Sequence, residues 1–209
     1  IAAGATHTYT LTIYAQLSAD VINGETSVSL CELDDGEYVP GQGLYNRATL
    51  VYGSGPISID VEDCGNIPGM IVPAKTFVSA SEADVDGYFT VTYTVSVENT
   101  GGTDETYDLV DTPEFDGQVT IHSNNVTGQI TNNFAGAGPY TLATGTTLAA
   151  GATHTYTLTI YAQLSAGVLS GSTNVSLCEL DGDNYVPGQG LYNRAVVTYG
   201  SQTNVMEVE

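Results

Sequence analysis

Acidic side chains are the residues of this chain that are best placed to bind a ligand. Asp84 and Asp86 lie two residues apart just before Gly87, so a turn would let both carboxylates reach one cation. The other candidate ligands lie in two acidic loops, which contain Asp34, Asp35 and Glu37, and Asp181 and Asp183. Carboxylate oxygens are the ligands that calcium prefers. Calcium is therefore the one cofactor that the sequence suggests.

These acidic residues also have a simpler explanation. Asp-Gly pairs favour tight turns, and exposed carboxylates keep a surface hydrated. The two loops differ in sequence, with DDGE at 34–37 and DGDN at 181–184, so they do not preserve one set of ligands. No stretch fits the twelve-residue helical calcium loop. Calcium binding and turn formation both stay open.

The three cysteines, Cys31, Cys64 and Cys178, indicate disulfide chemistry. We expect Cys31 to pair with Cys64 and close a loop of about 34 residues, which would stabilise the fold by about 3–4 kcal/mol. A Cys64–Cys178 bridge is the alternative. Either bridge requires an oxidising compartment, and we expect an extracellular, cell-surface location. A zinc site would need histidine near these cysteines, and none is close in the sequence.

No arrangement of residues predicts an enzyme active site. His7, His122 and His154 are scattered, whereas metal sites need clustered ligands. The sequence has no Ser-His-Asp arrangement with a nucleophile elbow and no phosphate-binding glycine loop. Asp111 and Glu114 form a possible carboxylate pair, but nothing around them predicts a cleft. We therefore expect a protein that is not an enzyme.

The charge of the chain excludes several classes of partner. Its formal net charge is −21, and its only basic residues are Arg47, Lys75 and Arg194. No cationic surface can be built from three such residues, so nucleic acid and anionic lipid are not expected as partners. No run of eighteen apolar residues occurs either, and we expect no insertion into a membrane.

A long internal repeat determines how the chain is organised. Residues 2–54 (the first copy) align with residues 149–201 (the second copy) at an offset of 147, without a gap, and differ at eleven of 53 positions. The match continues weakly beyond the copies, where residues 59, 61 and 62 align with residues 206, 208 and 209. A period this long is a whole domain. We expect residues 1–62 to be the last strands of one repeat and 63–209 to be one complete repeat.

The repeat also explains the odd number of cysteines. Cys178 is the counterpart of Cys31, so we expect its partner to lie outside the chain.

Alternating apolar and polar residues predict an all-β fold. Residues 88–98 place Phe89, Val91, Tyr93, Val95 and Val97 on one face, as in a half-buried antiparallel strand. Residues 153–164 repeat this alternation. The other expected strands are 70–78, 105–112, 118–123, 126–131, 140–147, 173–180, 193–199 and 203–208. So many short strands, separated by glycine-rich turns, predict an antiparallel β-sandwich of immunoglobulin type.

Three stretches together resemble a known family. They are YFTVTYTVSVENTGGTDETYDLVDTPEF (88–115), TLAAGATHTYTLTI (147–160) and GQGLYNRAVVTYG (188–200). They are similar to the conserved immunoglobulin-like repeats that occur in tandem in very large bacterial surface proteins and adhesins. The resemblance implies an immunoglobulin-like fold and a structural, extracellular role. It implies no ligand, because such repeats are usually spacers.

Residues 1–62 raise a separate expectation. Three or four strands without the rest of their domain leave an apolar face and unpaired edges exposed. We expect these residues to pack against material outside this chain, either a neighbouring repeat or another copy of the protein.

The sequence thus predicts a stalk or spacer repeat of a bacterial adhesin or fibre, which carries tension rather than catalysing a reaction. One alternative is a filament or sheath subunit that assembles by strand exchange between copies. Another is a glycan- or ice-binding module that uses its threonine rows, with Tyr14 and Tyr161 as stacking surfaces. High strand propensity explains the threonines more simply.

Overall fold

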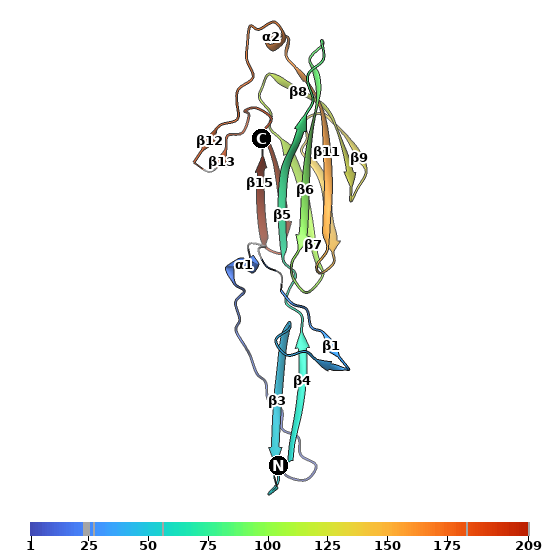
Figure 1. The fold of residues 1–209 in the computed structure, drawn as a ribbon, viewed down its shortest axis with the longest axis vertical. Helices are drawn as coiled ribbons and strands as arrows, with labels where there is room; N and C mark the ends of the chain where they lie inside the picture. The colour runs from blue at the N-terminus through green and yellow to red at the C-terminus, as the bar shows by residue number, and fades with distance from the viewer. Residues whose placement is uncertain (23–25, 27, 56, 183, 209) are drawn as a thin grey trace.

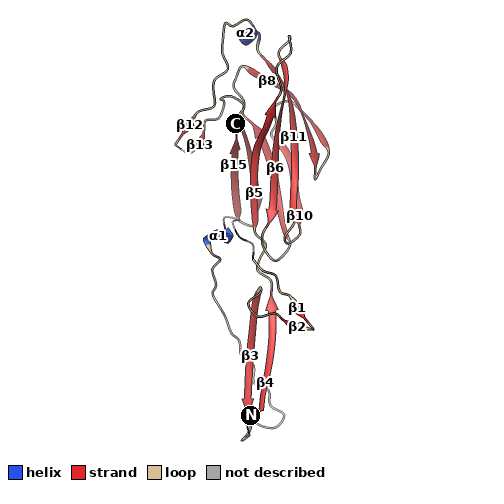
Figure 2. Ribbon diagram, in the orientation of Figure 1, coloured by secondary structure: helices blue, strands red, loops and turns tan. Residues whose placement is uncertain are grey.

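The computed structural model describes residues 1–22, 26, 28–55, 57–182 and 184–208, and these residues form mostly antiparallel β-sheet (Figure 2). The all-β prediction is confirmed. The strands are β1 (Leu33–Asp34), β2 (Glu37–Tyr38), β3 (Leu44–Tyr52), β4 (Ile57–Gly65), β5 (Ile71–Ala80), β6 (Tyr88–Asn99), β7 (Glu105–Pro113), β8 (Val119–Gly128), β9 (Asn132–Ala135), β10 (Tyr140–Leu148), β11 (Thr153–Leu164), β12 (Leu180–Asp181), β13 (Asn184–Tyr185), β14 (Asn193–Tyr199) and β15 (Gln202–Val208).

The helices in the described residues are single turns, α1 (Ala19–Ile22) and α2 (Ala166–Leu169). The hydroxyl of Ser165 caps α2 by accepting a hydrogen bond from the Val168 N–H. In the described part of the chain, no helix is long and apolar enough to cross a bilayer.

Two sheets make up the larger part of the molecule, from β5 to β15 (Figure 1). One sheet has five strands in the order β5-β6-β11-β8-β9, and the other has four in the order β10-β7-β14-β15. The long strands run along the longest axis of the molecule. We call residues 66–208, which contain these sheets, the two-sheet unit.

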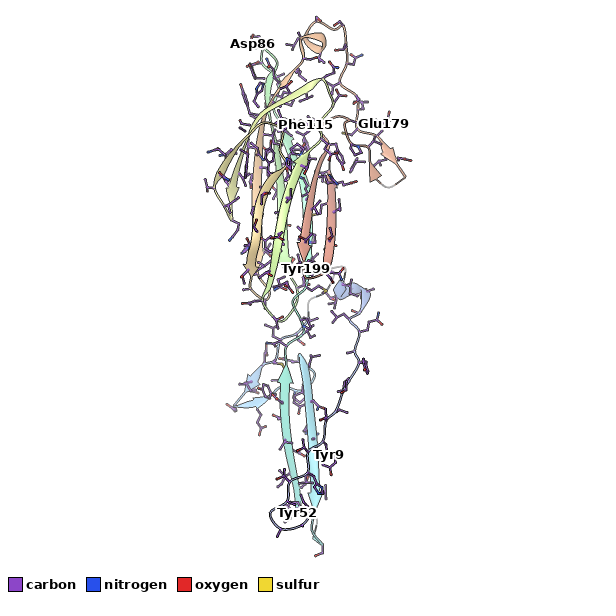
Figure 3. The ribbon with its side chains drawn as sticks, turned by 180° about the vertical axis from the view of Figure 1, so that it is seen from behind. Tyr9, Tyr52, Asp86, Phe115, Glu179 and Tyr199 are labelled. Carbon is purple, nitrogen blue, oxygen red and sulfur yellow. A yellow bond between two sulfur atoms is a disulfide. The ribbon has the colours of Figure 1, made fainter. Side chains whose placement is uncertain are left out.

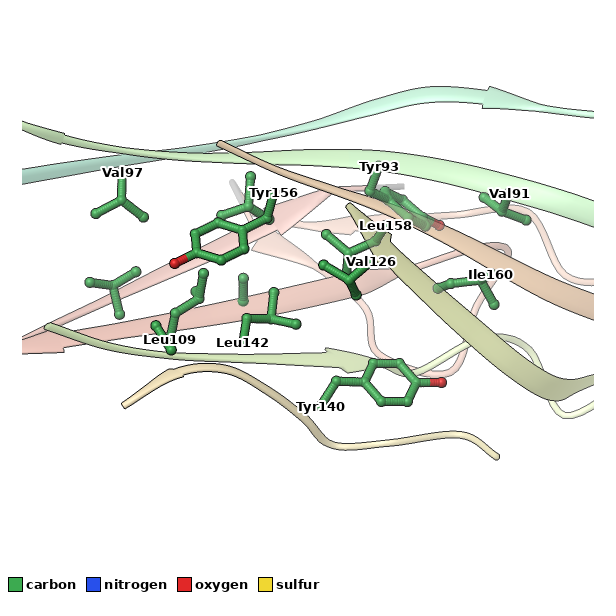
Figure 4. Packing of buried hydrophobic residues seen from close by; sticks show 14 of the residues in the cluster. Val91, Tyr93, Val97, Leu109, Val126, Tyr140, Leu142, Tyr156, Leu158 and Ile160 are labelled. Atoms are coloured by element: carbon green, nitrogen blue, oxygen red, sulfur yellow. The ribbon is translucent and has the colours of Figure 1, made fainter. Parts of the chain in front are cut away.

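The core contains inward-facing side chains from both sheets (Figure 4). On β6 the predicted face is buried, with exposed fractions from 0% for Val91 to 7% for Phe89. On β11, Tyr156, Leu158 and Ile160 are all 0% exposed. Leu109 and Val197 face them from β7 and β14. The alternation read from the sequence therefore sets which faces form the core.

Two expected strand boundaries are wrong. Residues 118–131 were expected to form two strands that meet near residue 124, but β8 runs unbroken from Val119 to Gly128 and the turn follows it. Asn124 and Asn125 stay within the strand, and Asn125 donates a side-chain hydrogen bond to Asn133 Oδ1 on β9 at 2.7 Å. Residues 173–180 form no strand before Leu180.

The first 65 residues, here called the N-terminal segment, are built differently. The segment contains the β3–β4 hairpin, the two-residue strands β1 and β2, and α1. It extends from one end of the two-sheet unit along the long axis, with the N-terminus at its far end (Figure 1). Residues 6–17 are all described but belong to no strand.

Local structure recurs at the offset of the sequence repeat. The helical turn α1, the strand β1 and the strand β2 each have a counterpart 147 residues later, in α2, β12 and β13. The hairpin β3–β4 corresponds to β14–β15. The two copies differ most at residues 6–17, which form no strand, whereas their counterpart is the central strand β11.

Strand register corrects the weak end of the sequence alignment. Arg47 pairs with Glu62 across β3 and β4, whereas Arg194 pairs with Glu207 across β14 and β15. Glu62 therefore corresponds to Glu207, not to residue 209. The turn after β3 connects Tyr52 to Ile57, and the turn after β14 connects Tyr199 to Gln202. The second hairpin is thus shorter at its turn, which an alignment without gaps cannot represent.

Candidate functional site

The predicted calcium ligand Asp84 has a structural role in the turn between β5 and β6. Its Oδ1 accepts the backbone N–H of Asp86 at 3.0 Å and that of Tyr88 at 2.8 Å. Gly87 completes the turn with φ of 85°. The Asp86 residue lies at the tip of the molecule (Figure 3). The acidic pair thus builds a turn, which is the simpler of the two explanations.

The loop of Asp34, Asp35 and Glu37 is also a tight turn. It joins β1 to β2, and both central residues have positive φ, 53° at Asp35 and 90° at Gly36. An Asp-Gly pair with this geometry is typical of two-residue hairpins.

The matching loop contains Asp181, which is exposed on β12, and Asp183, which lies outside the described residues. No group of three or more potential metal ligands occurs among the residues that the structure describes. Calcium binding stays a prediction.

A disulfide joins Cys31 to Cys64, with 5.9 Å between their Cα atoms, so the expected pairing is present rather than the Cys64–Cys178 alternative. The bridge ties the loop before β1 to the end of β4. Glu62 strengthens the same junction, because its carboxylate accepts the Tyr38 N–H at 2.9 Å and the Tyr45 hydroxyl at 2.8 Å. Cys178 is a free thiol beside the Gln189 carbonyl.

An apolar groove of about 900 Å³ lies where the N-terminal segment meets the two-sheet unit. Its lining includes Ile13 and Leu17 from the N-terminal segment and Ile71 and Tyr199 from β5 and β14. Figure 3 shows Tyr199 at this end of the two-sheet unit. None of the acidic candidate residues lines the groove.

The histidines take part in packing contacts. His154 Nδ1 lies 2.8 Å from the Tyr107 hydroxyl, which in turn lies 2.5 Å from the Tyr156 hydroxyl. Burial lowers the pKa of His154. His122 lies on the outer face of the five-stranded sheet beside Tyr88 and Tyr161, whose rings stack at a centroid distance of 5.2 Å.

Asp111 and Glu114, the possible carboxylate pair in the sequence, each contact a different basic residue and do not form one site. Glu114 accepts a hydrogen bond from the Arg194 guanidinium at 3.1 Å. Asp111 instead lies inside the protein, where it contacts Lys75. Arg47 and Asp60 form a looser exposed pair at 4.0 Å.

Sequence reasoning missed the most unusual polar cluster of the molecule, which consists of Lys75, Asp111 and Asn193. The side chains of Lys75 and Asp111 are both 0% exposed, and the Lys75 amine contacts Asp111 Oδ1. Asp111 Oδ2 has no hydrogen-bond partner among the described residues. Buried ion pairs without further hydrogen bonds are costly.

Asn193 lies beside this pair and is also 0% exposed. Asp111 pairs with Ala195 in the β7–β14 ladder, and Asn193 pairs with Pro113, so Asp111 and Asn193 are diagonal neighbours on one face. The amide lies close enough to Asp111 to stabilise its charged form, although no hydrogen bond of good geometry joins them. Neither Nδ2 nor Oδ1 of Asn193 has a partner among the described residues.

An aromatic ring lies beside the Lys75 end of the cluster, and two phenylalanine rings pack against it. The Lys75 amine lies 5.4 Å from the centre of the Tyr93 ring. Phe77 and Phe115 pack against the same ring at 5.8 Å and 6.4 Å. The Tyr93 hydroxyl donates a hydrogen bond to the Leu191 carbonyl, two residues before Asn193.

Burial shifts both charged groups toward their neutral forms. It lowers the pKa of the Lys75 amine, and the nearby Asp111 carboxylate raises that pKa in part. It raises the pKa of Asp111, and Lys75 and Asn193 lower that pKa in part. These directions follow from the loss of water around a charge.

One sequence signal could have indicated this cluster. Lys75 is the only lysine of the chain, and it lies on a strand in which the next residues are apolar or threonine. A lone lysine in such a strand is unusual in a chain that has 24 acidic residues to solubilise its surface.

Comparison with known protein families, with curated proteins and with solved structures gave no match in any of the three. The function of the chain is therefore inferred from its own sequence and geometry.

Proposed function

We propose that the chain is a section of a tandem array of immunoglobulin-like β-sandwich domains, which forms the stalk of a bacterial surface adhesin or fibre. Its role is mechanical and extracellular: serial domains give length, and their sheets carry tension. The observation that best supports this role is that one sequence occurs in two different environments within the chain.

The two environments differ in burial. Tyr156, Leu158 and Ile160 of β11 are 0% exposed, but their counterparts Tyr9, Leu11 and Ile13 are 87%, 71% and 68% exposed. β11 lies between β6 and β8 in its sheet, and the N-terminal segment contains no counterpart of those two strands among its described elements. An exposed segment with these apolar side chains and no neighbouring strand is unfavourable in water. Residues 6–17 therefore need a partner sheet.

The path of the chain fits a serial array. β4 leaves the β3–β4 hairpin and leads through a short connection into β5, the first strand of the two-sheet unit (Figure 1). β15, the counterpart of β4, is the last strand of the unit and the edge strand of the four-stranded sheet, next to β14. A further domain that followed β15 as β5 follows β4 would continue along the same axis.

The Cys31–Cys64 bridge supports the same role. It fastens the end of β4 to the loop before β1 at the junction with the two-sheet unit, so tension applied at this point would act on a covalent link. A disulfide also fits an oxidising location outside the cell.

Strand exchange between copies of the protein is the alternative that the exposed residues 6–17 favour. In that case a second copy, rather than a preceding domain, would supply the missing strands. The chain would then form ordered polymers without any other protein.

An extended chain distinguishes these possibilities. Residues 63–147 are placed before Ile1, which restores a full repeat, and backbone amide hydrogen exchange is measured. We expect amides of residues 6–17 to exchange rapidly in the present chain and, in the extended chain, to become as protected as those of residues 153–164. Continued rapid exchange in the extended chain would contradict the proposal. Protection in the present chain that grows with its concentration, together with polymers, would favour strand exchange.

A further inference from the structure

The buried cluster of Lys75, Asp111 and Asn193 brings together the components of an amide-forming reaction. A lysine amine is a nucleophile when it is neutral and free of water. A carboxamide offers a carbon that an amine can attack, and an adjacent carboxyl group can move the protons. All three side chains are fully buried, and they come from β5, β7 and β14.

We propose that Lys75 and Asn193 become joined by an intramolecular amide bond between Lys75 Nζ and Asn193 Cγ, with Asp111 as the proton carrier. The product is a covalent cross-link between the five-stranded sheet and the four-stranded sheet. This cross-link goes beyond the proposed mechanical role and does not depend on it.

The reaction balances without any other reagent. The neutral Lys75 amine attacks Asn193 Cγ while protonated Asp111 donates a proton to the amide oxygen. Asp111 then accepts a proton from Nζ and delivers one to Nδ2, so that the C–Nδ2 bond breaks and ammonia leaves. The carbonyl re-forms as the amide oxygen returns its proton to Asp111. No oxidant, reductant or water is consumed.

The surroundings favour these protonation states. A buried lysine and a buried aspartate that share one proton can exist as an ion pair or as two neutral groups, and loss of water favours the neutral groups. Lys75, Asp111 and Asn193 are 0% exposed, so bulk water does not reach the cluster, which also prevents hydrolysis of the intermediate.

Asn193 is favoured over Asp111 as the partner of Lys75 for two reasons. First, both polar atoms of the Asn193 amide are buried without a hydrogen-bond partner among the described residues, which is rare for a side chain with only a packing role. Second, condensation of Lys75 with Asp111 would require another group to move the protons. The other polar side chains near that pair are Asn193, Tyr93 and Tyr140, and none of them is an acid of suitable strength.

The mass of the chain tests the proposal directly. The complete chain is purified, reduced, denatured and weighed by mass spectrometry, then digested with trypsin. We expect the intact mass to fall below the sequence mass by one ammonia molecule. We also expect trypsin to cut after Arg47 and Arg194 but not after Lys75, because a lysine in an amide bond is not a trypsin site.

Substitutions locate the bond. Lys75→Met and Asn193→Ala should each restore the mass calculated from their sequences. Asp111→Asn, which keeps the shape of the side chain, should leave Lys75 open to trypsin. Asn46→Ala changes the matching position of the first copy, so it should still show the loss of ammonia. Circular dichroism of each variant shows whether it folds, and the Asp111→Asn result alone suffices if the other two do not.

Three results would overturn the proposal. The first is an intact mass equal to the sequence mass, with cleavage after Lys75. The second is loss of one water molecule with a link to Asp111, which would assign a different bond. The third is loss of ammonia that persists in Lys75→Met, which would indicate a cyclised asparagine instead. None of these results bears on hydrogen exchange in residues 6–17, so the two proposals can fail separately.

Discussion

Asp116 illustrates how a single acidic side chain contributes to this fold. Its Oδ1 accepts the Gln118 N–H at 2.7 Å, and its Oδ2 accepts both the hydroxyl and the N–H of Ser176, the latter at 3.0 Å. The carboxylate thereby joins the turn before β8 to the loop before β12. The hydrogen bond from the Ser176 hydroxyl, followed by that from Gln118, lowers the pKa of Asp116.

This shift predicts a pH dependence of stability. Because folding lowers the pKa of Asp116, the unfolded chain takes up the proton first as pH falls. The contribution of Asp116 is therefore complete above its unfolded pKa of about 4 and is lost as pH falls through the lower folded pKa. Asp116→Asn should lower the free energy of unfolding at pH 7 by about 1 kcal/mol.

Denaturant unfolding at pH 7 and at low pH checks this prediction. The difference between the wild-type chain and Asp116→Asn should shrink at low pH. Asp86→Asn serves as the control, since Asp86 is exposed at a turn tip and should behave as the wild type does. An equal loss of stability in both variants would contradict the role given to Asp116.

At the scale of the strand, the alternation of apolar and polar residues correctly predicted the strands that have one buried face. The ranges 153–164 and 193–199 match β11 and β14, and 88–98 matches β6 to within one residue. Each of these strands has one apolar face, and burial of that face fixes both its period and its register.

The predicted strand at residues 173–180 is absent because side chains, rather than a neighbouring strand, form hydrogen bonds with its backbone. In residues 173–180, the Ser176 N–H donates to Asp116 Oδ2 and the Glu179 N–H donates to Gln189 Oε1. These partners lie outside the stretch, so its alternating polar and apolar residues, such as Val175, Ser176 and Leu177, indicated a strand that does not form. The helical turns α1 and α2 are too short to show a period in the sequence.

The repeat provides a matched test of burial on a strand. Leu158→Ala removes a side chain that is 0% exposed in the core, whereas Leu11→Ala removes its counterpart, which is 71% exposed. We expect Leu158→Ala to lower the free energy of unfolding by about 3 kcal/mol, through lost burial and the cavity it leaves. Leu11→Ala should change it by less than about 0.5 kcal/mol.

Chemical denaturation of the two variants measures this difference, because the same residue is removed from the same local sequence. Similar losses of stability would show that residues 6–17 are packed in solution as β11 is, and would contradict their exposed placement.

At the scale of the molecule, the buried cluster shows why sequence alone was insufficient. Lys75 and Asn193 are far apart in the chain and belong to different sheets, and no spacing rule brings them together. Their meeting depends on how β5 packs against the four-stranded sheet. A bond between them would also connect the first strand of the unit to β14, so that tension applied to β5 and β15 would bypass most of the core.

The whole chain offers only three trypsin sites, which makes limited proteolysis of the native protein a sharp test of its architecture. Arg47 lies on β3, whose only described sheet neighbour is β4, and 56% of its side chain is exposed. Arg194 lies on β14, between β7 and β15, and the side chain of Lys75 is fully buried. We expect a first cut after Arg47, because an isolated two-stranded hairpin opens readily.

The Cys31–Cys64 bridge spans this cut, so the two fragments should stay together on a non-reducing gel and separate only after reduction. Arg47→Gln is the matched control, and it should leave the native chain intact under the same conditions. The Cys64→Ser variant should release residues 1–47 without reductant. A first cut after Arg194, or fragments that separate while the bridge is intact, would contradict an architecture in which a bridged, open hairpin precedes a closed two-sheet unit.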